Sequence, residues 1–277
     1  MAQGAPLILL AVFGQPVSQS LSPRIHGLFA RQCGLEIEYR AIEASADTFR
    51  DQLEQLHSAG GLGCNVTAPL KNEAWRVADR ASAGANRAEA ANTLRFSKDE
   101  WYADNTDGGG LVWDLQTSEG FELPGMRVCL LGAGGAAAGV LGTLLSNGPQ
   151  VVFVANRTVE KAQRLAQRHI DIGPVEVCAL DALAGTGPFD LIINATSLGH
   201  RGQAPKVSPG WLADGGLCYD MNYGGAAEPL RERCREQGIA YRDGLGMLVG
   251  QAALSFELWT GKTPDGKAAL KQLAGAN

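Results

Sequence analysis

Two short polar segments in the first half of the chain carry the side chains best suited to proton transfer. One segment reads NVTAPLK over residues 65–71, and the other reads DNTDG over residues 104–108. Pro69 can open a helix, which places the Lys71 ammonium in the first helical turn, at the positive end of the helix dipole. A cation is electrostatically unfavourable there, so its presence indicates a function. We expect Lys71 to be the acid or base of a reaction.

The role of Asp107 has two interpretations. The helix dipole favours a carboxylate near a helix start, so Asp107 can be a helix cap or a member of the catalytic site. If Asp107 pairs with Lys71, its negative charge opposes the effect of the dipole on the lysine. Both interpretations stay open, as does the question whether Lys71 acts alone or as a dyad with Asp107.

A third polar cluster reads SLSP over residues 20–23. On an extended segment, residues two apart point the same way, so Ser20 and Ser22 can bind one carboxylate together. Ser22 is also a good N-cap for a helix that begins at Pro23. The two roles are compatible.

The elements around these clusters must position them, and the first third of the chain predicts an α/β domain. Apolar runs typical of buried strands alternate with amphipathic helical patterns. Strands are expected at residues 7–13, 38–42 and 63–66, helices at 23–33 and 46–58, and a hairpin at 92–96 and 101–103, followed by a helix from about residue 107. We assign residues 1–110 to a substrate-binding and catalytic domain.

The pattern changes after a stretch without periodicity at residues 117–125. Strands are expected at 127–131, 151–155, 175–179, 191–194, 217–221 and 239–241, with helices at 136–146 and 158–168. Strands that alternate with helices indicate parallel βαβ units, so residues 111–245 are predicted to form a Rossmann domain. The apolar helix at 247–259 is expected to return to the first domain, which then includes residues 246–277.

The first strand of the second domain leads into a glycine turn. Residues 130–137 read LLGAGGAA, which fits the pattern GxGxxG/A with alanine at the third position. The glycines allow a tight turn and the approach of a phosphate, and the helix N-terminus favours the pyrophosphate charge. A plain structural turn is the alternative. The residues expected to bind the dinucleotide here are Gly132, Ala133, Gly134, Gly135 and Ala136.

The choice between NAD and NADP depends on the end of the next strand. An NAD enzyme places Asp or Glu there to bind the ribose 2′-hydroxyl. This chain has Asn156, Arg157 and Thr158 instead, and Lys161 follows in the next helix. A guanidinium binds a 2′-phosphate through charge-assisted hydrogen bonds, so NADP is the predicted cofactor. The alternative role for Arg157 is an exposed helix cap.

The composition argues against several classes of function. The chain has 277 residues and a net charge of −5, from 24 Lys and Arg against 29 Asp and Glu, without a basic run. A nucleic-acid or membrane partner is therefore not expected. The 6 cysteines are widely spaced without a CxxC pair, which argues against a metal site and favours reduced thiols in the cytoplasm. The N-terminal apolar run lacks a basic segment before it and is interpreted as a strand rather than a signal peptide.

Taken together, these segments resemble those of the shikimate dehydrogenase family, in the same order and over nearly the whole chain. The matching segments are SLSP (20–23), NVTxPxK (65–71), ANT (91–93), DNTDG (104–108), GAGGA (132–136), NRT (156–158), NATSxG (194–199), YDM (219–221) and DGLGMLVxQAA (243–253). The resemblance implies the reversible NADP-linked interconversion of shikimate and 3-dehydroshikimate, a step of aromatic amino-acid biosynthesis. It also implies two α/β domains flanking a cleft, the second a Rossmann-type doubly wound parallel sheet.

The resemblance implies roles for individual residues as well. Lys71 is expected to be the acid/base group, with Asp107 bonded to it and to the substrate hydroxyls. Ser20 and Ser22 are expected to hold the substrate carboxylate, and the rest of the pocket is implied to be Thr67, Asn92, Tyr223 and Gln251. The nicotinamide side is implied to be lined by Thr196, Met221 and Gly244. The expected partner is the small-molecule substrate, for a protein that is a monomer or a homodimer.

The chain departs from the family pattern at three places. Gly27 follows His26 where an amide side chain is frequent, His200 stands where methionine is common, and residues 224–229 read GGAAEP in place of a loop that usually has threonine before proline. The departure at residues 224–229 affects the expected closure of this loop and the assignment of the chain to a subfamily. The unmatched His57 and His169 are expected at solvated helix positions.

Three competing functions are weighed against this one. A quinate-oxidising relative that uses NAD is disfavoured by Ser22, where threonine often stands in that branch, and by Arg157. A non-catalytic NADP-binding sensor has no need of a proton-transfer pair such as Lys71 and Asp107. A folate-linked dehydrogenase of similar architecture does not account for the two serines of the SLSP segment.

Overall fold

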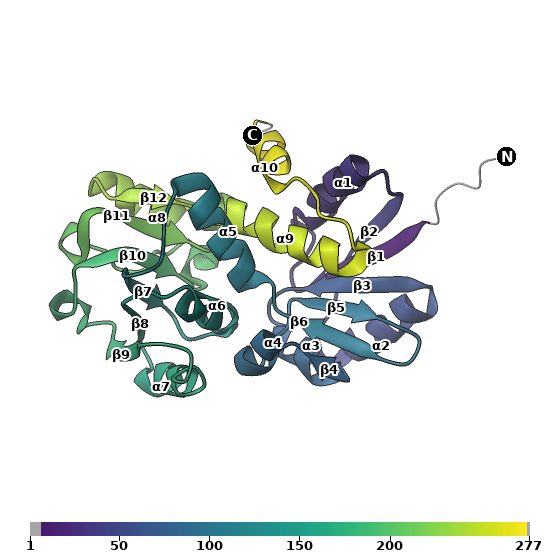
Figure 1. Cartoon of the computed structure of the whole chain (residues 1–277), viewed down its shortest axis with the longest axis horizontal. Coiled ribbons are helices and arrows are strands. Elements are labelled where there is room, and N and C mark those ends of the chain that lie inside the picture. Colours follow the sequence, from purple (N-terminus) through teal and green to yellow (C-terminus); the bar gives the residue numbers. More distant parts are fainter. Residues whose placement is uncertain (1–6, 276–277) are drawn as a thin grey trace. The chain divides into compact units, whose positions relative to one another are not determined.

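A computed structural model describes residues 7–275 of the protein, which divide into two compact α/β units. The first unit combines the residues up to Gly110 with those from Val249 onward, and the second comprises Leu111–Leu248 (Figure 1). The second unit is thus an insertion in the sequence of the first. Helices α5 (Asp107–Glu119) and α9 (Leu245–Thr260) contain the two points of division.

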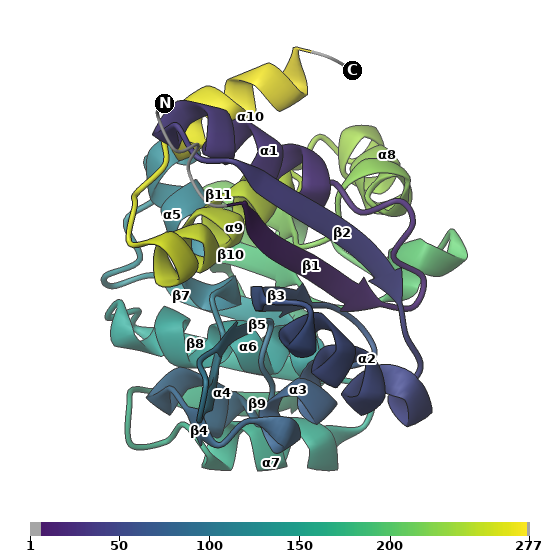
Figure 2. The same ribbon diagram turned by 90° about the vertical axis from the view of Figure 1, so that its right-hand side faces the viewer.

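A mixed sheet forms the centre of the first unit. Its strands are β1 (Ile8–Gly14), β2 (Ile37–Glu43), β3 (Gly61–Val66), β4 (Arg80–Ala81), β5 (Thr93–Phe96) and β6 (Trp101–Asp104), in the order β2-β1-β3-β5-β6-β4. β1 is parallel to β2 (Figure 2) and to β3, whereas β5 is antiparallel to β3 and to β6. The end of β3 therefore lies beside the start of β5, where Asn65 pairs with Thr93.

Helices pack on this sheet through their apolar faces. They are α1 (Ser22–Cys33), α2 (Ala46–Ser58), α3 (Lys71–Val77) and α4 (Ala83–Ala88), whereas α10 (Gly266–Ala274) packs against α1. α2 has the predicted bounds, and its buried Phe49, Leu53 and Leu56 recur at helical spacing. Phe49 contacts Phe13 of β1 edge to face, with 5.6 Å between the ring centroids. This apolar layer supports the strand ends that carry the polar motifs.

The last part of the chain completes the first unit. The Trp259 indole nitrogen of α9 donates a hydrogen bond to the Leu94 carbonyl of β5 at 2.9 Å. The helix approaches so closely that a Cβ at Gly63 of β3 would lie 2.4 Å from that nitrogen. Beyond α9, Asp265 and Gln32 of α1 exchange two hydrogen bonds, of 3.0 and 3.2 Å. Glycine at position 63 is therefore required by the returning helix.

The second unit contains a fully parallel sheet. Its strands are β7 (Arg127–Leu131), β8 (Val151–Asn156), β9 (Val175–Ala179), β10 (Phe189–Asn194), β11 (Leu212–Asp220) and β12 (Ala240–Arg242), in the order β12-β11-β10-β7-β8-β9. Counted from β7, this is the strand order of the Rossmann fold, with the topological switch between β7 and β10. The predicted doubly wound sheet is confirmed.

Helices α6 (Gly135–Ser146), α7 (Val159–Gln167) and α8 (Glu228–Glu236) connect these strands. Four short 3₁₀ helices lie in the loops: η1 (Leu183–Gly185), η2 (Leu198–Arg201), η3 (Pro209–Trp211) and η4 (Gly224–Ala226). Sequence analysis did not single out α8, which begins within the GGAAEP departure, with Pro229 in its first turn. Proline is well tolerated there because it lacks the N–H that a helix start leaves unpaired.

A buried carboxylate joins three elements of the second unit. Asp114 of α5 accepts hydrogen bonds from Tyr219 of β11 at 2.7 Å and from Ser118 at 2.8 Å, and forms an ion pair with Arg242 of β12 at 3.0 Å. A Cβ at Gly246 would lie 2.0 Å from the Asp114 carboxylate. The prediction that periodic structure ends before residue 117 is wrong, because α5 continues to residue 119 and Ser118 bonds back to Asp114 in this extra turn.

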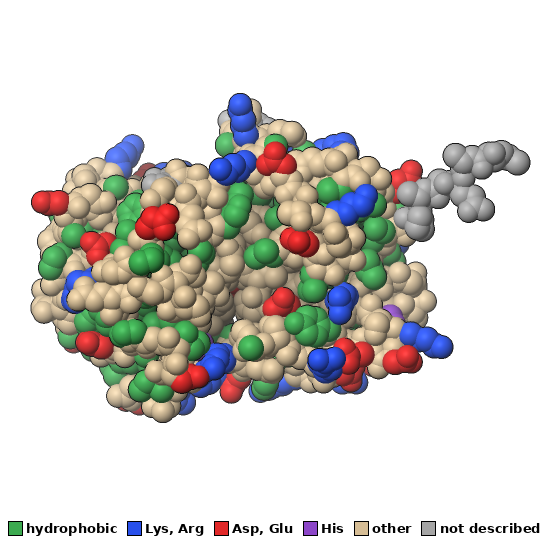
Figure 3. All heavy atoms as spheres, in the orientation of Figure 1, with side chains coloured by type: hydrophobic (Ala, Val, Ile, Leu, Met, Phe, Trp, Pro, Cys, Tyr) green, Lys and Arg blue, Asp and Glu red, His purple; other side chains and the backbone are tan. Residues whose placement is uncertain are grey.

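Acidic and basic side chains are interspersed on the face of the molecule shown in Figure 3. No helix within residues 7–275 has both the length and the apolar character needed to cross a membrane. The same residues contain no group of three or more His, Cys, Asp and Glu side chains arranged to hold a metal ion. All six cysteine thiols are free.

Candidate active site

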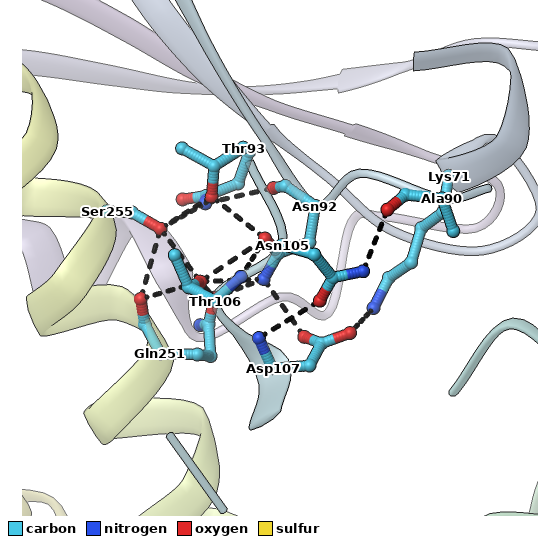
Figure 4. A network of polar contacts seen from close by, with 10 residues as sticks. Lys71, Ala90, Asn92, Thr93, Asn105, Thr106, Asp107, Gln251 and Ser255 are labelled. Atoms are coloured by element: carbon cyan, nitrogen blue, oxygen red, sulfur yellow. Dashed lines mark hydrogen bonds and ion pairs between the residues drawn. The ribbon is translucent and has the colours of Figure 1, made fainter. Parts of the chain in front are cut away.

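Lys71 and Asp107 form an ion pair within the first unit. The Lys71 Nζ donates a hydrogen bond to the Asp107 Oδ2, and the two side chains are 20% and 7% exposed (Figure 4). Each is the first residue of its helix, Lys71 of α3 and Asp107 of α5. The structure thus brings together the two residues that the sequence favours for proton transfer.

The start of α3 differs in detail from the prediction. The helix begins at Lys71 itself, two residues after Pro69, and Leu70 is its N-cap. A turn precedes the helix, in which the Leu70 amide donates to the Thr67 carbonyl at 3.0 Å. The Lys71 carbonyl accepts a hydrogen bond from the Ala91 amide at 2.8 Å, so the lysine backbone is tied to the segment before β5.

Asn105 provides the capping bond at the start of α5. Its Oδ1 accepts a hydrogen bond from the Asp107 amide at 3.2 Å, and its Nδ2 donates to the Ala90 carbonyl at 2.9 Å. This is the role that a cap side chain plays at a helix N-terminus. The Asp107 carboxylate is therefore available to Lys71.

Asn92 holds the other oxygen of the Asp107 carboxylate. The Asn92 Nδ2 donates to the Asp107 Oδ1 at 2.9 Å and to the Gln251 Oε1 at 3.1 Å. Its Oδ1 accepts from the Thr106 amide at 2.9 Å, and because a backbone N–H can only donate, the orientation of the Asn92 amide is determined. The carboxylate presents Oδ2 to Lys71 because an uncharged donor occupies Oδ1.

The polar network continues from Asn92 into the core (Figure 4). The Thr93 and Ser255 hydroxyls are 2.7 Å apart, and Ser255 lies one helical turn after Gln251 on α9. The Asn65 Nδ2 reaches the Ser255 Oγ at 3.0 Å and the Asn92 carbonyl at 3.2 Å. Sequence analysis did not single out Asn65 or Ser255. Their signal is a polar side chain at a buried position, and Asn65 also stands in the Lys71 motif.

The other residues expected to bind substrate lie near the carboxyl ends of β1 and β3. Thr67 follows β3, and its amide donates to the Phe13 carbonyl at 2.8 Å. Ser20 is half-buried and Ser22 is buried. Two expectations for this pair are wrong: Ser20 closes a turn with Val17 rather than lying in an extended segment, and Ser22 is the first residue of α1 rather than its cap. The Ser20 hydroxyl accepts a hydrogen bond from the Ser22 amide at 3.2 Å, so Ser20 provides the hydrogen bond that caps the start of α1.

Tyr223 belongs to the second unit, unlike the other residues expected to bind substrate. It follows β11 and is the N-cap residue of η4. Burial raises the pKa of the Tyr223 phenol. The hydroxyl is therefore neutral at neutral pH.

The glycine turn of the second unit has the geometry that a phosphate site needs. Gly132 follows β7 with a φ of +113°, which favours glycine, and a Cβ there would lie 3.1 Å from the Ala195 carbonyl. Gly134 is the N-cap of α6, and Gly134 and Gly135 are exposed with open space where a side chain would stand. Ala133 and Ala136 are half-buried beside them. The first amides of α6 are thus accessible to an anion.

The residues expected to select NADP lie at the carboxyl end of β8. Asn156 ends the strand, and its Nδ2 donates to the Thr158 carbonyl at 2.8 Å. Arg157 is exposed, as are Thr158, the N-cap of α7, and Lys161 within that helix. Two cations therefore face solvent in the segment after the second strand of the Rossmann sheet, and the N-cap is Thr158 rather than Arg157.

Thr196, Met221 and Gly244 are brought together at the carboxyl ends of β10, β11 and β12. The Met221 amide donates to the Asn194 carbonyl at 3.0 Å, and the Thr196 hydroxyl donates to the Asn194 Oδ1 at 2.7 Å. A Cβ at Gly244 would lie 2.5 Å from the Met221 carbonyl. Burial raises the pKa of Asp220, which accepts a hydrogen bond from the Asn194 Nδ2 at 2.9 Å.

Two histidines contradict their predicted environments. His169 is only 1% exposed, lies just after α7, and its Nδ1 is 2.9 Å from the Leu165 carbonyl. Gly142 of α6 leaves the room for this ring, since a Cβ there would lie 3.3 Å from it. His57 is half-buried, with its ring 5.5 Å from that of Phe96. Neither is a fully solvated helix residue.

A Rossmann sheet with an open glycine turn, together with a second α/β unit that holds a part-buried Lys–Asp pair, defines the class of two-domain dinucleotide-dependent dehydrogenases. Models of three family segments match the chain: the shikimate dehydrogenase substrate binding domain at residues 12–94, shikimate/quinate 5-dehydrogenase at 115–201, and the shikimate 5′-dehydrogenase C-terminal domain at 244–274. The chain belongs to the shikimate dehydrogenase family, which confirms the resemblance.

Individual relatives are similar over nearly their whole length. The shikimate dehydrogenase (NADP(+)) of Methylococcus capsulatus is 45% identical, over 95% of this chain and 95% of that protein. The crystal structure of an Ael1 enzyme from Pseudomonas putida has a TM-score of 0.86 and 40% identity, covering 96% of this chain and 98% of that one. Shikimate 5-dehydrogenase from Thermus thermophilus, in complex with NADP(H) and shikimate, has a TM-score of 0.83 and 31% identity, covering 98% of this chain and 100% of that one.

Replacement of His26 by Gln is expected to weaken the acid dependence of stability. Burial lowers the pKa of His26 from 6.5 to about 3. Between these values the unfolded chain binds a proton at His26 that the folded protein does not, so the free energy of unfolding falls as the pH is lowered through this window. The wild-type slope should exceed that of His26→Gln by about 1.4 kcal/mol per pH unit. Urea denaturation at several pH values within the window measures both slopes, and equal slopes would contradict a buried neutral imidazole.

Proposed function

We propose that the protein catalyses the reversible NADPH-dependent reduction of 3-dehydroshikimate to shikimate, a step of aromatic amino-acid biosynthesis. The observation that carries the proposal is the part-buried ion pair of Lys71 and Asp107, which lies at the starts of two helices and is held by Asn92. Membership of the shikimate dehydrogenase family supports the substrate, and NADP(+) in the name of the Methylococcus relative supports the cofactor.

Lys71 is proposed as the group that moves the proton. When bound, NADPH supplies the hydride that adds to the carbonyl carbon. Lys71 then gives its Nζ proton to the carbonyl oxygen, so the ketone becomes an alcohol and charge does not accumulate on the oxygen. In the reverse direction the lysine accepts the hydroxyl proton. Asp107, with Asn92 bound to its Oδ1, keeps the ammonium group in place through Oδ2.

The substrate is proposed to be held mainly by uncharged donors of the first unit. Ser20 and Ser22 bind its carboxylate, and the ring hydroxyls bind to Asp107, Asn92 and Gln251. Thr67 and Tyr223 complete the pocket. Support comes from the hydrogen bonds that already fix Asn92 and Gln251 against Asp107, because a site held rigid before binding loses less entropy when the substrate arrives.

NADP is proposed to bind the second unit, with residues 132–136 at the pyrophosphate and residues 156–158 and Lys161 at the 2′-phosphate. The residues present fit this group: the open space at Gly134 and Gly135 admits a phosphate, and Arg157 is exposed at the strand end where an NAD enzyme has a carboxylate. Thr196, Met221 and Gly244 are proposed for the nicotinamide side.

The competing functions have weaker support. The family model at residues 115–201 carries both shikimate and quinate in its description, so a quinate-oxidising branch is the second candidate. The part-buried Lys71–Asp107 pair disfavours a non-catalytic sensor, because a sensor has no need of a proton-transfer pair. We also propose a cytoplasmic location, which the six free thiols support, and a monomeric or homodimeric state.

Shikimate with NADP should be the preferred substrate pair. The initial rate of NADP reduction is expected to be far higher with shikimate than with quinate, and higher than the rate of NAD reduction with either acid. A four-way rate comparison by nicotinamide absorbance measures this. Equal rates with quinate would move the protein to the quinate branch, and no turnover of any pair would refute the proposed reaction.

The Lys71→Ala variant should lose turnover, with kcat lowered about 10²–10⁴-fold, because one acid/base group contributes that much. The affinity for shikimate should change little, since other residues bind the substrate. Steady-state kinetics and shikimate titration measure the two effects. Lys98→Ala, at an exposed position in the β5–β6 turn, is the matched control. Near-full turnover in Lys71→Ala would show that proton transfer does not depend on this side chain.

Arg157→Ala should weaken binding of NADP by about 10–100-fold and leave NAD nearly unaffected, because only NADP offers a phosphate to the guanidinium. Arg164→Ala, an exposed cation on the same helix α7, is the control for a general change of charge. Dissociation constants from fluorescence titration separate the cases. An equal loss for both cofactors would leave Arg157 without a role in selecting the phosphate.

A further inference from the structure

His26 of α1 is a buried titratable group that the proposed reaction does not use. Its ring is fully buried and stacks on Tyr39 of β2, with 4.5 Å between the ring centroids and 7° between the ring planes. Phe29, Phe256 and Trp259 enclose it, with ring centroids 5.9, 6.2 and 5.4 Å away. Burial lowers the pKa of the imidazole to about 3, so the ring is neutral at neutral pH.

The hydrogen bonds identify the tautomer of this ring. The Asn65 Nδ2 faces the Asn92 carbonyl, which can only accept, so the Asn65 atom that lies 3.1 Å from the His26 Nε2 is the acceptor Oδ1. Nε2 must therefore carry the proton. The other ring nitrogen, Nδ1, is buried and has no hydrogen-bond partner among the described residues. A buried unpaired acceptor is unfavourable, so what distinguishes histidine from an apolar residue here is the Nε2–H donor.

A second donor converges on the same oxygen. The Tyr39 hydroxyl donates to the Asn65 Oδ1 at 2.7 Å. With Oδ1 held from two directions, the Asn65 amide plane is fixed. Its Nδ2 then lies 3.2 Å from both the Thr93 hydroxyl and the Asn92 carbonyl, at the point where β3 pairs with β5. Asn92 in turn holds the Asp107 carboxylate.

We propose that His26 is a positioning residue for proton transfer: with Tyr39 it orients the Asn65 amide, which holds Asn92 and thereby keeps Asp107 aligned with Lys71. The connection runs through three hydrogen-bonded steps and uses no atom of the substrate. This inference rests on the proposed function, since the reaction supplies its kinetic readout.

The test compares two replacements of similar size. His26→Phe keeps the aromatic contacts but removes the donor, whereas His26→Gln can place an amide N–H where Nε2–H stood. In His26→Phe, kcat for shikimate oxidation should fall about 10–100-fold, as expected for a displaced catalytic group, and KM should change less. His26→Gln should recover most of that loss. His57→Gln, a half-buried histidine of α2 outside this network, is the matched control.

Stability must be separated from positioning. Thermal unfolding of each variant shows whether a loss of rate follows a loss of folded protein. If His26→Phe folds and keeps the wild-type kcat, or if His26→Gln is no better than His26→Phe, the proposal is wrong. If His26→Phe does not fold, Tyr39→Phe removes the other donor to the same Asn65 oxygen, and an unchanged kcat in that variant also overturns the proposal.

An NMR measurement distinguishes failure of this inference from failure of the proposed function. Long-range ¹H–¹⁵N correlations of the wild-type imidazole should show a neutral ring with the proton on Nε2 at neutral pH. The Asn92 side-chain amide resonances should shift in His26→Phe and return toward the wild-type positions in His26→Gln. These spectra need no turnover, so an enzyme inactive toward shikimate still tests the positioning. A charged ring, a proton on Nδ1, or unshifted Asn92 resonances would overturn it.

Discussion

The carboxylate of Asp107 is the constraint around which the first unit is organised. At 7% exposure it has lost most of its hydration, so it must gain a charged partner and hydrogen-bond donors from the protein. Lys71 provides the charge and Asn92 the neutral donor. The three side chains come from the starts of α5 and α3 and from the residue before β5. In the surrounding polar network, the Thr106 amide and the Asn65 side chain both bond to Asn92 and so hold these three side chains in position.

In the second unit, close contacts between backbone segments take the place of these side-chain hydrogen bonds. There the carboxyl ends of the parallel strands carry small residues at the points where chain segments meet: Gly132 after β7 and Gly244 after β12. A Cβ at Gly244 would clash with the Met221 carbonyl, and at Gly132 the positive φ and the nearby Ala195 carbonyl both disfavour a side chain. Gly132 lies at the topological switch point between β7 and β10, where a Rossmann sheet needs room for a tight turn, and Gly244 lets the segment after β12 pack against Met221.

Most of the elements could be predicted from periodicity alone, because α2 and the strands of the Rossmann sheet have long, regular patterns. The pairing of Lys71 with Asp107 could be anticipated as a possibility from the motifs. The connections between side chains could not. That Asn105 caps α5, or that Ser20 takes the capping bond expected of Ser22, depends on turn geometry that single residue types do not encode. His169 was misplaced because its burial depends on Gly142 in another helix. The two-residue strand β4 and the short helix α4 are too brief to show a period.

The insertion of the second unit has a consequence for biosynthesis. Gln251 and Ser255 lie on α9, after the whole Rossmann sheet, yet they bond to Asn92 and Thr93. A nascent chain emerging from the ribosome therefore contains Lys71 and Asp107 long before it contains α9, the helix that bonds to Asn92 and Thr93. The second unit can complete its own strand order before α9 is available to cover β3 and β5 of the first unit. Loss of α9 and α10, by a premature stop codon or proteolysis, would remove Gln251 and Ser255 from the first unit and leave intact the strands of the second unit, which precede them in the sequence.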